Sequence, residues 1–229
     1  MRLMYGSALA VAIAVLAPPV IGAQGQEANR TVSGGGITAA GWQGKADGAG
    51  QVNDAKLSQD GKDLKVTTGP AVTYWNPANK ASGNYTVKAT FSEPKYMNLN
   101  NHPHPYGIVI AGNDMGTATQ SYLYCAAYGN GNFIVRGFGP DSFQMNGGRG
   151  EANAAVHKAE GKDQPVTQEI AMSVKGDKVS CTINGTEVWS ANKGDVVGAG
   201  KLKSTDGVWG FRFAHNTEGH VFGLTSTKP

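Results

Sequence analysis

The chain has 229 residues, of which 33 are glycine, 10 are proline and only 16% are charged, and its formal net charge is +3. The lysines and arginines are scattered singly, with no basic run or basic helix, which disfavours nucleic acid as a partner. This length suffices for one domain with a sizeable core, and the glycine-rich, weakly charged composition is typical of an all-β sandwich.

The N-terminus has the features of a signal peptide. Arg2 supplies a positive charge, and an unbroken apolar run follows from Ala8 to Leu16. Pro18 breaks that run, and Ala23 is a small residue at which signal peptidase would cut. The run is too short for a membrane span of about 20 residues, so we expect no membrane insertion of the mature chain.

We therefore predict three segments: a signal peptide over residues 1–23, a flexible N-terminal segment over 24–36 and a single β-sandwich domain over 37–229. Cleavage near Ala23 would deliver the protein to the periplasm or the medium. No cysteine follows the cleavage point, which disfavours a lipid anchor.

Strand patterns begin soon after the flexible segment. Residues 57–68 predict two short strands around a turn at Asp60-Gly61, and residues 71–75 predict a strand that Asn76-Pro77 ends. Residues 85–91 alternate most clearly, with Tyr, Val, Ala and Phe on the inward side.

The polar loop 95–105 contains two histidines, His102 and His104, separated by one residue. Such a pair could chelate a metal ion, and His215 and His220 lie further along the chain. However, prolines interleave the first pair and no neighbouring carboxylate completes a ligand set. We therefore predict a polar rim here, with neither a metal ion nor another cofactor.

Three further strands are predicted over 106–112, 121–128 and 132–138, the last two joined by a Gly-Asn-Gly turn. Because side chains alternate along a strand, one face receives Tyr122, Tyr124, Ala126 and Tyr128. The other face receives Leu123, Cys125 and Ala127. We interpret the second set as core and the first as an exposed aromatic surface; alternatively, the tyrosine rings merely cover the sheet.

Residues 164–189 predict a meander whose last hairpin turns at Asn184-Gly185. Residues 195–205 predict a short helix and a loop, and two strands over 207–216 and 220–225 close the chain. No long helix is predicted.

The chain has two cysteines, Cys125 and Cys181, both on the inward side of a predicted strand. Disulfides persist in exported proteins, so a bridge across the interior is plausible, although two separate buried thiols remain an alternative. Neither cysteine has a second one at the spacing of a zinc site.

The order of these pieces resembles the concanavalin A-like lectin/glucanase sandwich and, within it, the 3-keto-disaccharide hydrolase domain family. The matching stretches are 84–91, 106–110, 121–124, 174–185 and 207–213. The resemblance implies a jelly roll of two antiparallel sheets. It says little about function, because these residues are mainly strand and turn positions.

The resemblance also implies that the strands of 106–138 lie in the concave sheet and the meander of 169–189 in the opposing one. We therefore predict a carbohydrate site on the concave face, because rings suit the C–H face of a sugar and polar side chains can fix its hydroxyl groups. Its floor would consist of Tyr122, Tyr124, Arg136 and Arg212. Its rim would consist of Trp75, His104, Asn113 and Asp114.

Catalytic carboxylates are not evident. Glycosidases usually hold two carboxyl groups about 5–10 Å apart, and the family-16 enzymes that share this sandwich carry Glu-x-Asp-x-x-Glu on one strand. This chain has no such strand: Glu169 stands at the start of a predicted strand, and Asp114, Asp141 and Glu218 lie in loops. A non-catalytic carbohydrate-binding protein is therefore favoured. The alternatives are a hydrolase acting on modified (3-keto) disaccharides or related glycosides, and a structural envelope protein.

Overall fold

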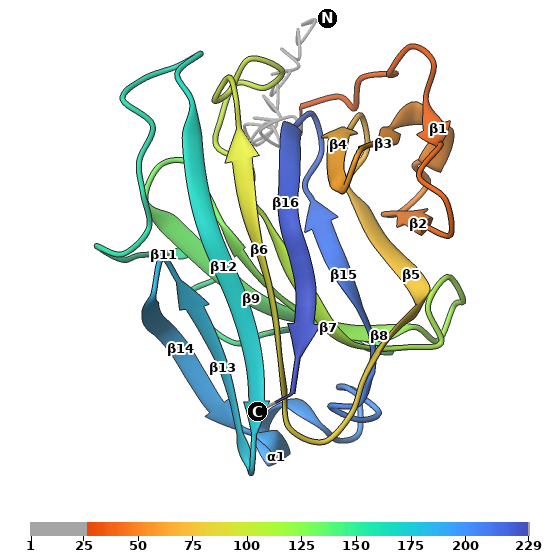
Figure 1. Cartoon of the computed structure of the whole chain (residues 1–229), viewed down its shortest axis with the longest axis vertical. Helices are drawn as coiled ribbons and strands as arrows, with labels where there is room; N and C mark the ends of the chain where they lie inside the picture. The colour runs from red at the N-terminus through yellow and green to blue at the C-terminus, as the bar shows by residue number, and fades with distance from the viewer. Residues whose placement is uncertain (1–26, 229) are drawn as a thin grey trace, which may run out of the picture.

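A computed structural model of the chain describes residues 27–228 (Figure 1). The predicted signal peptide, residues 1–23, lies outside the described residues. No helix within 27–228 combines the length and the apolar character that a membrane crossing requires.

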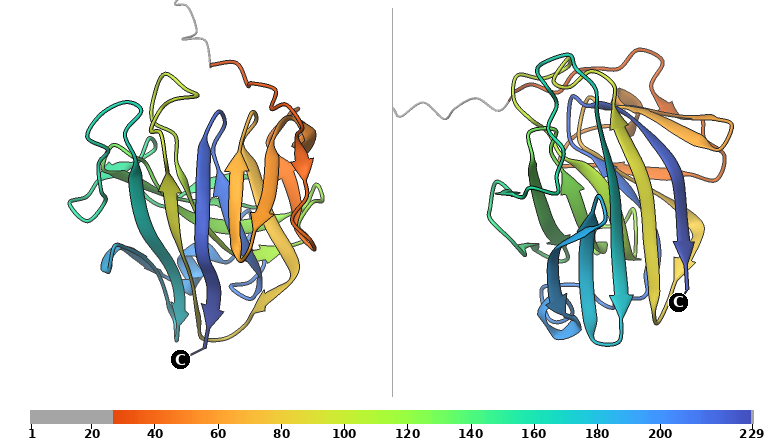
Figure 2. Two further views of the ribbon diagram at one scale, coloured as in Figure 1. Left: turned by 45° about the horizontal axis from the view of Figure 1, so that its top comes forward. Right: turned by 60° about the vertical axis from the view of Figure 1, so that its left-hand side comes forward.

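The chain folds into two sheets that pack face to face (Figures 1 and 2), which confirms the predicted all-β sandwich. In spatial order, the first sheet contains β1 (Gly36–Ile37), β3 (Lys56–Asp60), β4 (Asp63–Thr67), β16 (Glu218–Thr227), β6 (Tyr85–Glu93), β12 (Val166–Lys175), β13 (Lys178–Ile183) and β14 (Thr186–Asn192). The second sheet contains β10 (Ser142–Gln144), β9 (Asn132–Phe138), β8 (Ser121–Ala127), β7 (Tyr106–Asn113), β15 (Gly207–Phe213), β5 (Val72–Ala81) and β2 (Gln43–Ala46). A short strand, β11 (Glu151–Ala152), also pairs with β9. Neighbouring strands are antiparallel except β1 and β3.

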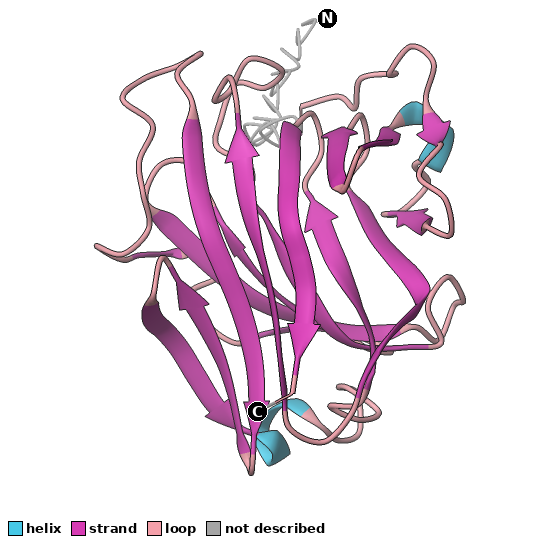
Figure 3. Ribbon diagram, in the orientation of Figure 1, coloured by secondary structure: helices cyan, strands magenta, loops and turns pink. Residues whose placement is uncertain are grey.

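Within residues 27–228, helical structure is confined to two short pieces (Figure 3), the 3-10 helix Val52–Asp54 and α1 (Lys193–Val196). The sequence predicted the second of these a little later, within 195–205. The strands β7, β8 and β9 share one sheet and the meander β12–β14 lies in the other, as the resemblance implied. The last hairpin turns at Asn184 (φ +48°) and Gly185 (φ +82°), the backbone that the Asn-Gly pair favours.

Strand β5 differs from the prediction, because it continues through Asn76-Pro77 to Ala81 instead of ending there. Trp75 pairs with Gly210 of β15, and the next paired residue of β5 is Lys80, opposite Val208. The strand thus passes an irregularity at which Pro77, which lacks a backbone N–H, has no ladder partner on β15.

The inner faces of the two sheets form the main core. On β6, the alternation predicted from the sequence is confirmed, since Tyr85, Val87, Ala89 and Phe91 are all buried in that core. Leu123 on β8 lies there too. Cys125 of β8 and Cys181 of β13 form a disulfide between the sheets, with their Cα atoms 6.3 Å apart.

The described part of the N-terminal segment, residues 27–36, is bound to the domain, although the sequence predicted flexibility for 24–36. The side chain of Asn216 accepts a hydrogen bond from the backbone N–H of Arg30 (2.9 Å) and donates one to the carbonyl of Ala28 (3.0 Å). The backbone N–H of Val32 donates to the carbonyl of Asp54 (3.3 Å). These bonds satisfy backbone groups of residues 28–32 with partners that are distant in the sequence and could not be predicted from it.

Candidate functional site

The outer face of the second sheet carries a second cluster of buried side chains, which we call the outer cluster. Its members are Val109, Tyr122, Tyr124, Ala126 and Ile134, with Met115, Tyr128 and Phe138 packed against them. Leu123 and Cys125 lie in the main core on the other side of the same strand. The predicted division of β8 into two faces is therefore correct.

The predicted exposure of the tyrosines is wrong. Tyr122 is 1% exposed and Tyr124 is 4% exposed, so their rings do not form an open aromatic surface. The loop between β7 and β8 folds back over this face: Met115 packs on the outer cluster, and the ammonium group of Lys45 on β2 donates to the carbonyl of Thr117 (2.5 Å). The alternative that the rings cover the sheet describes them better.

A buried arginine completes the outer cluster. The guanidinium of Arg212, which is 8% exposed, donates to both carboxylate oxygens of Asp47, one at 2.9 Å, and to the hydroxyl of Thr73 (2.8 Å). Its central carbon lies 5.5 Å from the ring centre of Tyr124 and 5.3 Å from that of Phe138, within cation–π distance.

These contacts keep Arg212 charged. Burial by itself would lower the pKa of Arg212, but the neighbouring Tyr122 and Asp47 outweigh burial, and the pKa lies above its ordinary value. Burial raises the pKa of the Tyr122 hydroxyl, which bonds to the hydroxyl of Thr73 (3.0 Å). The pair of Asp47 and Arg212 thus consists of a buried cation and a carboxylate that is 44% exposed.

Arg136 also lies on this face, because it stands directly opposite Tyr124 in the β8–β9 ladder. It is half-buried, and its guanidinium donates to the side chain of Gln144 (2.8 Å) and to the carbonyl of Gly148 (3.3 Å). Phe138, opposite Tyr122, is half-buried as well. The sequence predicted Arg136 on this face but not Phe138 or Asp47. Phe138 shares the face because it lies two residues after Arg136 on the same strand, and Asp47 reaches it from the loop after β2.

The predicted rim residues do not gather around the outer cluster. Trp75 is 4% exposed and lies beneath the β7–β8 loop, where a Cβ atom at Gly116 would stand 3.4 Å from its ring. Asn113 and Asp114 instead line a pocket of about 560 Å³ at the end of the sheet where β5 and β7 end and β15 begins. Asp206 lines the same pocket. A hydrogen bond from Lys203 holds the pKa of Asp114 below its usual value.

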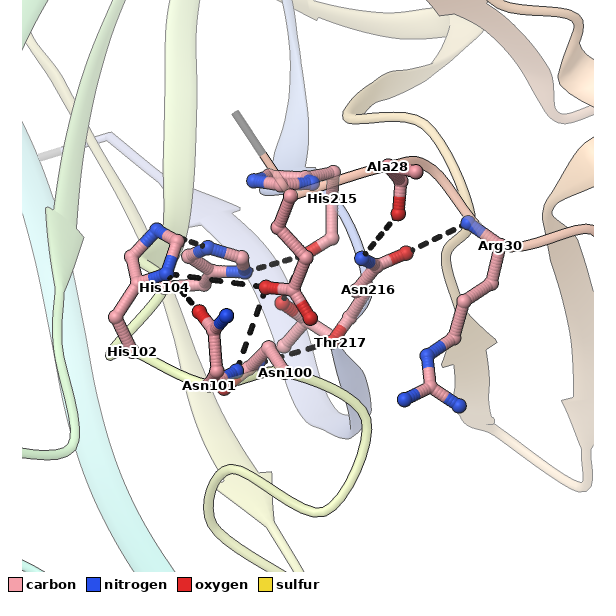
Figure 4. A network of polar contacts seen from close by, with 10 residues as sticks. Ala28, Arg30, Asn100, Asn101, His102, His104, His215, Asn216 and Thr217 are labelled. Carbon is pink, nitrogen blue, oxygen red and sulfur yellow. Dashed lines mark hydrogen bonds and ion pairs between the residues drawn. The ribbon is translucent and has the colours of Figure 1, made fainter. Parts of the chain in front are cut away.

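His104 lies at the other end of the second sheet, together with His102 and His215 (Figure 4). One ring nitrogen of each histidine lies within 4.8 Å of the other two. Burial, followed by the neighbouring histidines, lowers the pKa of His104 to about 3, and burial also lowers that of His215. His220 is not part of this group. The sequence predicted a polar rim here; it offered His215 as a further histidine but did not predict that it lies beside His104.

The pairing of β7 with β15 explains that juxtaposition. Tyr106 stands opposite Phe213, so the residues just before β7 and just after β15 lie side by side. His104 precedes Tyr106 by two positions and His215 follows Phe213 by two. The positions of His104 and His215 relative to these two strands could have predicted their proximity, but only if the pairing of β7 with β15 had been known.

Among the described carboxyl groups, Glu93 is the one whose pKa is raised, to about 7, because it is buried. It points into the space between the sheets and is 2% exposed. It therefore belongs neither to the outer face nor to the pocket. A carboxyl group so enclosed cannot reach a glycosidic bond.

The sequence matches no protein-family model and no curated protein. Solved structures are similar in fold. A Bacillus subtilis protein of unknown function with a galectin-like fold aligns over 82% of this chain and 89% of its own, at 13% identity and a TM-score of 0.54. A carbohydrate-binding module from Bacillus subtilis aligns over 84% and 98%, at 8% identity and 0.48. Sheep galectin-11 aligns over 65% and 92%, at 10% identity and 0.41.

The Bacillus subtilis protein with the galectin-like fold has a TM-score above 0.5, and this chain shares its β-sandwich fold. At these identities the likeness is one of fold, and no family model matches that would support the finer resemblance to 3-keto-disaccharide hydrolases.

Proposed function

We propose that this chain is an exported, non-catalytic protein that binds a carbohydrate on the outer face of its second sheet. The proposal goes beyond the fold, which several unrelated functions share. It rests on how the outer cluster presents one ring and two charged groups at the surface.

The ring is that of Phe138. Its centroid lies 4.9 Å from that of Tyr122 and 6.1 Å from that of Tyr124, and it is half-buried where both tyrosines are fully buried. The tyrosines thus serve as supports that fix Phe138, and the partly open ring offers an apolar surface to the C–H face of a sugar. A fixed ring loses little conformational freedom on binding, which favours affinity.

The charged groups are Asp47 and Arg136. The guanidinium of Arg212 contacts both the ring of Phe138 and the carboxylate of Asp47. The ring and the carboxylate are therefore separated only by this guanidinium group. This adjacency carries the proposal: a carboxylate accepts hydrogen bonds from sugar hydroxyl groups while the ring packs on the sugar. Arg136, opposite Tyr124, adds donors next to it.

A second candidate is hydrolysis of a modified glycoside such as a 3-keto disaccharide. The pocket of about 560 Å³ favours it, since Asp114 and Asp206 both line that pocket. However, a glycosidase needs one carboxyl group that stays protonated, and the ion pair with Lys203 favours the ionised form of Asp114. A binding function therefore has the better support.

A glycan array followed by calorimetry tests the proposal. The intact protein should bind at least one glycan, and Phe138→Ala should weaken that binding by about tenfold or more. Asp47→Asn should weaken it by a comparable factor through the lost charge. Phe222→Ala, which changes a half-buried residue of β16 in the first sheet, and Asp177→Asn, which changes an exposed residue of the β12–β13 turn, are the matched controls and should leave affinity unchanged.

Three results would contradict this assignment. Binding that is unaffected by Phe138→Ala and Asp47→Asn would place the carbohydrate elsewhere. Release of sugar from 3-keto disaccharides, lost in Asp206→Asn, would establish the second candidate. A protein that binds no glycan and releases no sugar would leave the structural envelope role. Intact-mass measurement of exported material checks the proposed start near Gln24 separately.

A further inference from the structure

The three histidines at the opposite end of the second sheet from the pocket have no part in the proposed carbohydrate site. His102 and His104 come from the loop between β6 and β7, and His215 comes from the turn between β15 and β16 (Figure 4). The ring centroid of His104 lies 4.3 Å from that of His102 and 4.0 Å from that of His215. Three imidazole rings this close together require specific contacts that fix their orientation.

The hydrogen bonds of His104 fix which of its nitrogens is free. Its Nδ1 lies 2.5 Å from the backbone carbonyl oxygen of His215, which can only accept, so Nδ1 carries the hydrogen. In the neutral ring, Nε2 of His104 then presents a lone pair. That lone pair faces Nε2 of His102 at 2.8 Å.

His102 is oriented in the same sense. Its Nδ1 lies 2.6 Å from the side-chain oxygen of Asn101 and 3.8 Å from the carboxylate of Glu27, two acceptors on the side away from His104. A hydrogen on Nδ1 donates to the side-chain oxygen of Asn101, with the Glu27 carboxylate beyond hydrogen-bond distance, and leaves a second lone pair at Nε2 of His102. Two lone pairs that face each other at this distance repel, and either a hydrogen on one Nε2 or a cation held by both nitrogens removes that repulsion. On the third ring, Nδ1 of His215 is buried and has no hydrogen-bonding partner in the described structure.

The surrounding bonds hold the two loops in place. The side chain of Asn100 donates to the carbonyl of Asn216 (2.9 Å), which ties the β6–β7 loop to the β15–β16 turn (Figure 4). Asn216 is fully buried and binds Ala28 and Arg30 in turn. The backbone N–H of Asn101 donates to Glu27 (3.3 Å). The three rings are thus presented by a scaffold that exists without any ligand.

We propose that His102, His104 and His215 form a binding site for a divalent transition-metal ion of the zinc class. Neutral imidazole nitrogens suit zinc, copper, nickel and iron(II), and three of them leave a fourth coordination position open to solvent beside His102. The carbonyl of His215 and the carboxylate of Glu27 act on Nδ1 of His104 and of His102 as the outer partners that orient metal-bound histidines.

The required movement is small. Two nitrogens that each lie about 2.0–2.1 Å from a tetrahedral zinc ion are about 3.3 Å apart, so the Nε2 atoms of His102 and His104 need to separate by about half an ångström. The side chain of His102 is 54% exposed and can turn by that amount, whereas His104 is 5% exposed and stays in place. We expect His102 to turn away from His104 to admit the ion.

The test is calorimetric titration of Zn²⁺ into the full chain, produced without a polyhistidine tag and stripped with a chelator. We expect one ion per chain. His102→Ala should weaken binding by at least about 100-fold, and Glu27→Gln by about 10- to 100-fold through the lost orientation of His102. His157→Ala and His220→Ala remove histidines outside the group and should leave affinity unchanged.

A spectroscopic measurement makes the result specific. Co²⁺ bound by three imidazoles in tetrahedral geometry gives visible d–d absorption, which should appear in the native protein and be absent in His102→Ala. Because His102 is mostly exposed, this variant should keep the circular dichroism spectrum and unfolding midpoint of the native protein, so loss of the ion cannot be ascribed to unfolding. Native binding that is no tighter than that of His102→Ala, or equal losses in His157→Ala and His220→Ala, would overturn the proposal.

Discussion

The two faces of β8 are equally buried but are closed in different ways. On the inner face, Leu123 and Cys125 meet the opposing sheet through apolar contacts and a disulfide. On the outer face, Tyr122 and Tyr124 are covered by a loop, by Phe138 and by the charged Arg212. Burial alone therefore does not distinguish the inside of this sandwich from its outside. The polar groups do: a charged guanidinium is hydrogen-bonded in the outer cluster, whereas the hydroxyl groups of Tyr74 and Tyr106 in the main core have no partner in the described structure.

The two faces also differ in the hydrogen-bond partners that they provide for a buried ionisable group. Arg212, on the outer face of the second sheet, is bonded to Asp47 and Thr73 and remains charged. Glu93 points into the space between the sheets and accepts one hydrogen bond, from the backbone N–H of Met97 (3.1 Å), while its other oxygen has no partner in the described part of the chain. A carboxyl group placed so is more stable when protonated.

The largest effect should come from truncating either face. Tyr124→Ala should lower the free energy of unfolding by about 3–5 kcal/mol, because it removes a ring that is buried on the outer side. Leu123→Ala, the matched change on the inner side, should cost about 2–5 kcal/mol. Denaturant titration measures both. If Tyr124→Ala cost less than about 1 kcal/mol, the outer cluster would be a loosely held surface rather than a second core.

The disulfide should contribute almost as much, and only to the inner face. It closes a loop with a sequence separation of 56, for which the chain-entropy relation gives about 4 kcal/mol. Replacing both cysteines by alanine should therefore lower the unfolding free energy by up to that amount. The contacts of Tyr122 and Arg212 lie on the other face, so near-ultraviolet circular dichroism of the tyrosines should change little below the unfolding transition.

Glu93 should make the inner space sensitive to pH. Its pKa is about 7 in the folded protein against an ordinary value of 4.5, so between these values the folded protein holds a proton that the unfolded chain releases. The free energy of unfolding should therefore fall as pH rises from about 4.5 to about 7, by about 3 kcal/mol. Below about pH 4.5 the contribution of this group is fully present.

Glu93→Gln isolates that contribution. The substitution keeps the shape and the acceptor for Met97 while it removes the charge, so the variant should be the more stable protein at neutral pH and should lose this part of the pH dependence. Glu218→Gln, which changes a half-buried carboxyl group on β16, is the control. An unchanged pH profile in Glu93→Gln would mean that the carboxylate is solvated.

The same comparison shows what the sequence could reveal. Strict alternation in 85–91 and 121–127 predicted which side chains face the main core, because that rule is local. It could not predict that the outward tyrosines are covered, since their cover comes from Met115 in a separate loop and from Arg212 on a strand far along the chain. The turn at Asn184-Gly185 was predictable for the same local reason.

The candidate sites were harder to predict than the fold. Arg136 was placed correctly because it stands opposite Tyr124 in a hairpin. Asn113 ends β7 and Asp114 follows it, but both line a separate pocket, and His104 lies beside His215 only because β7 pairs with β15. Such long-range pairing is not encoded in any local pattern of a single sequence.

The smallest effect should come from one hydroxyl group on the outer face. Tyr122→Phe keeps the ring against Phe138 and removes only the bond to Thr73 (3.0 Å) and the longer contact with Arg212 (3.4 Å). Thr73 keeps its bond from Arg212 (2.8 Å), and Arg212 keeps Asp47, so no buried partner is left unsatisfied. We therefore expect a cost of about 0.5–1.5 kcal/mol, well below that of Tyr124→Ala. If Tyr122→Phe cost as much as Tyr124→Ala in the same denaturant titration, the polar network rather than ring packing would hold the outer face together.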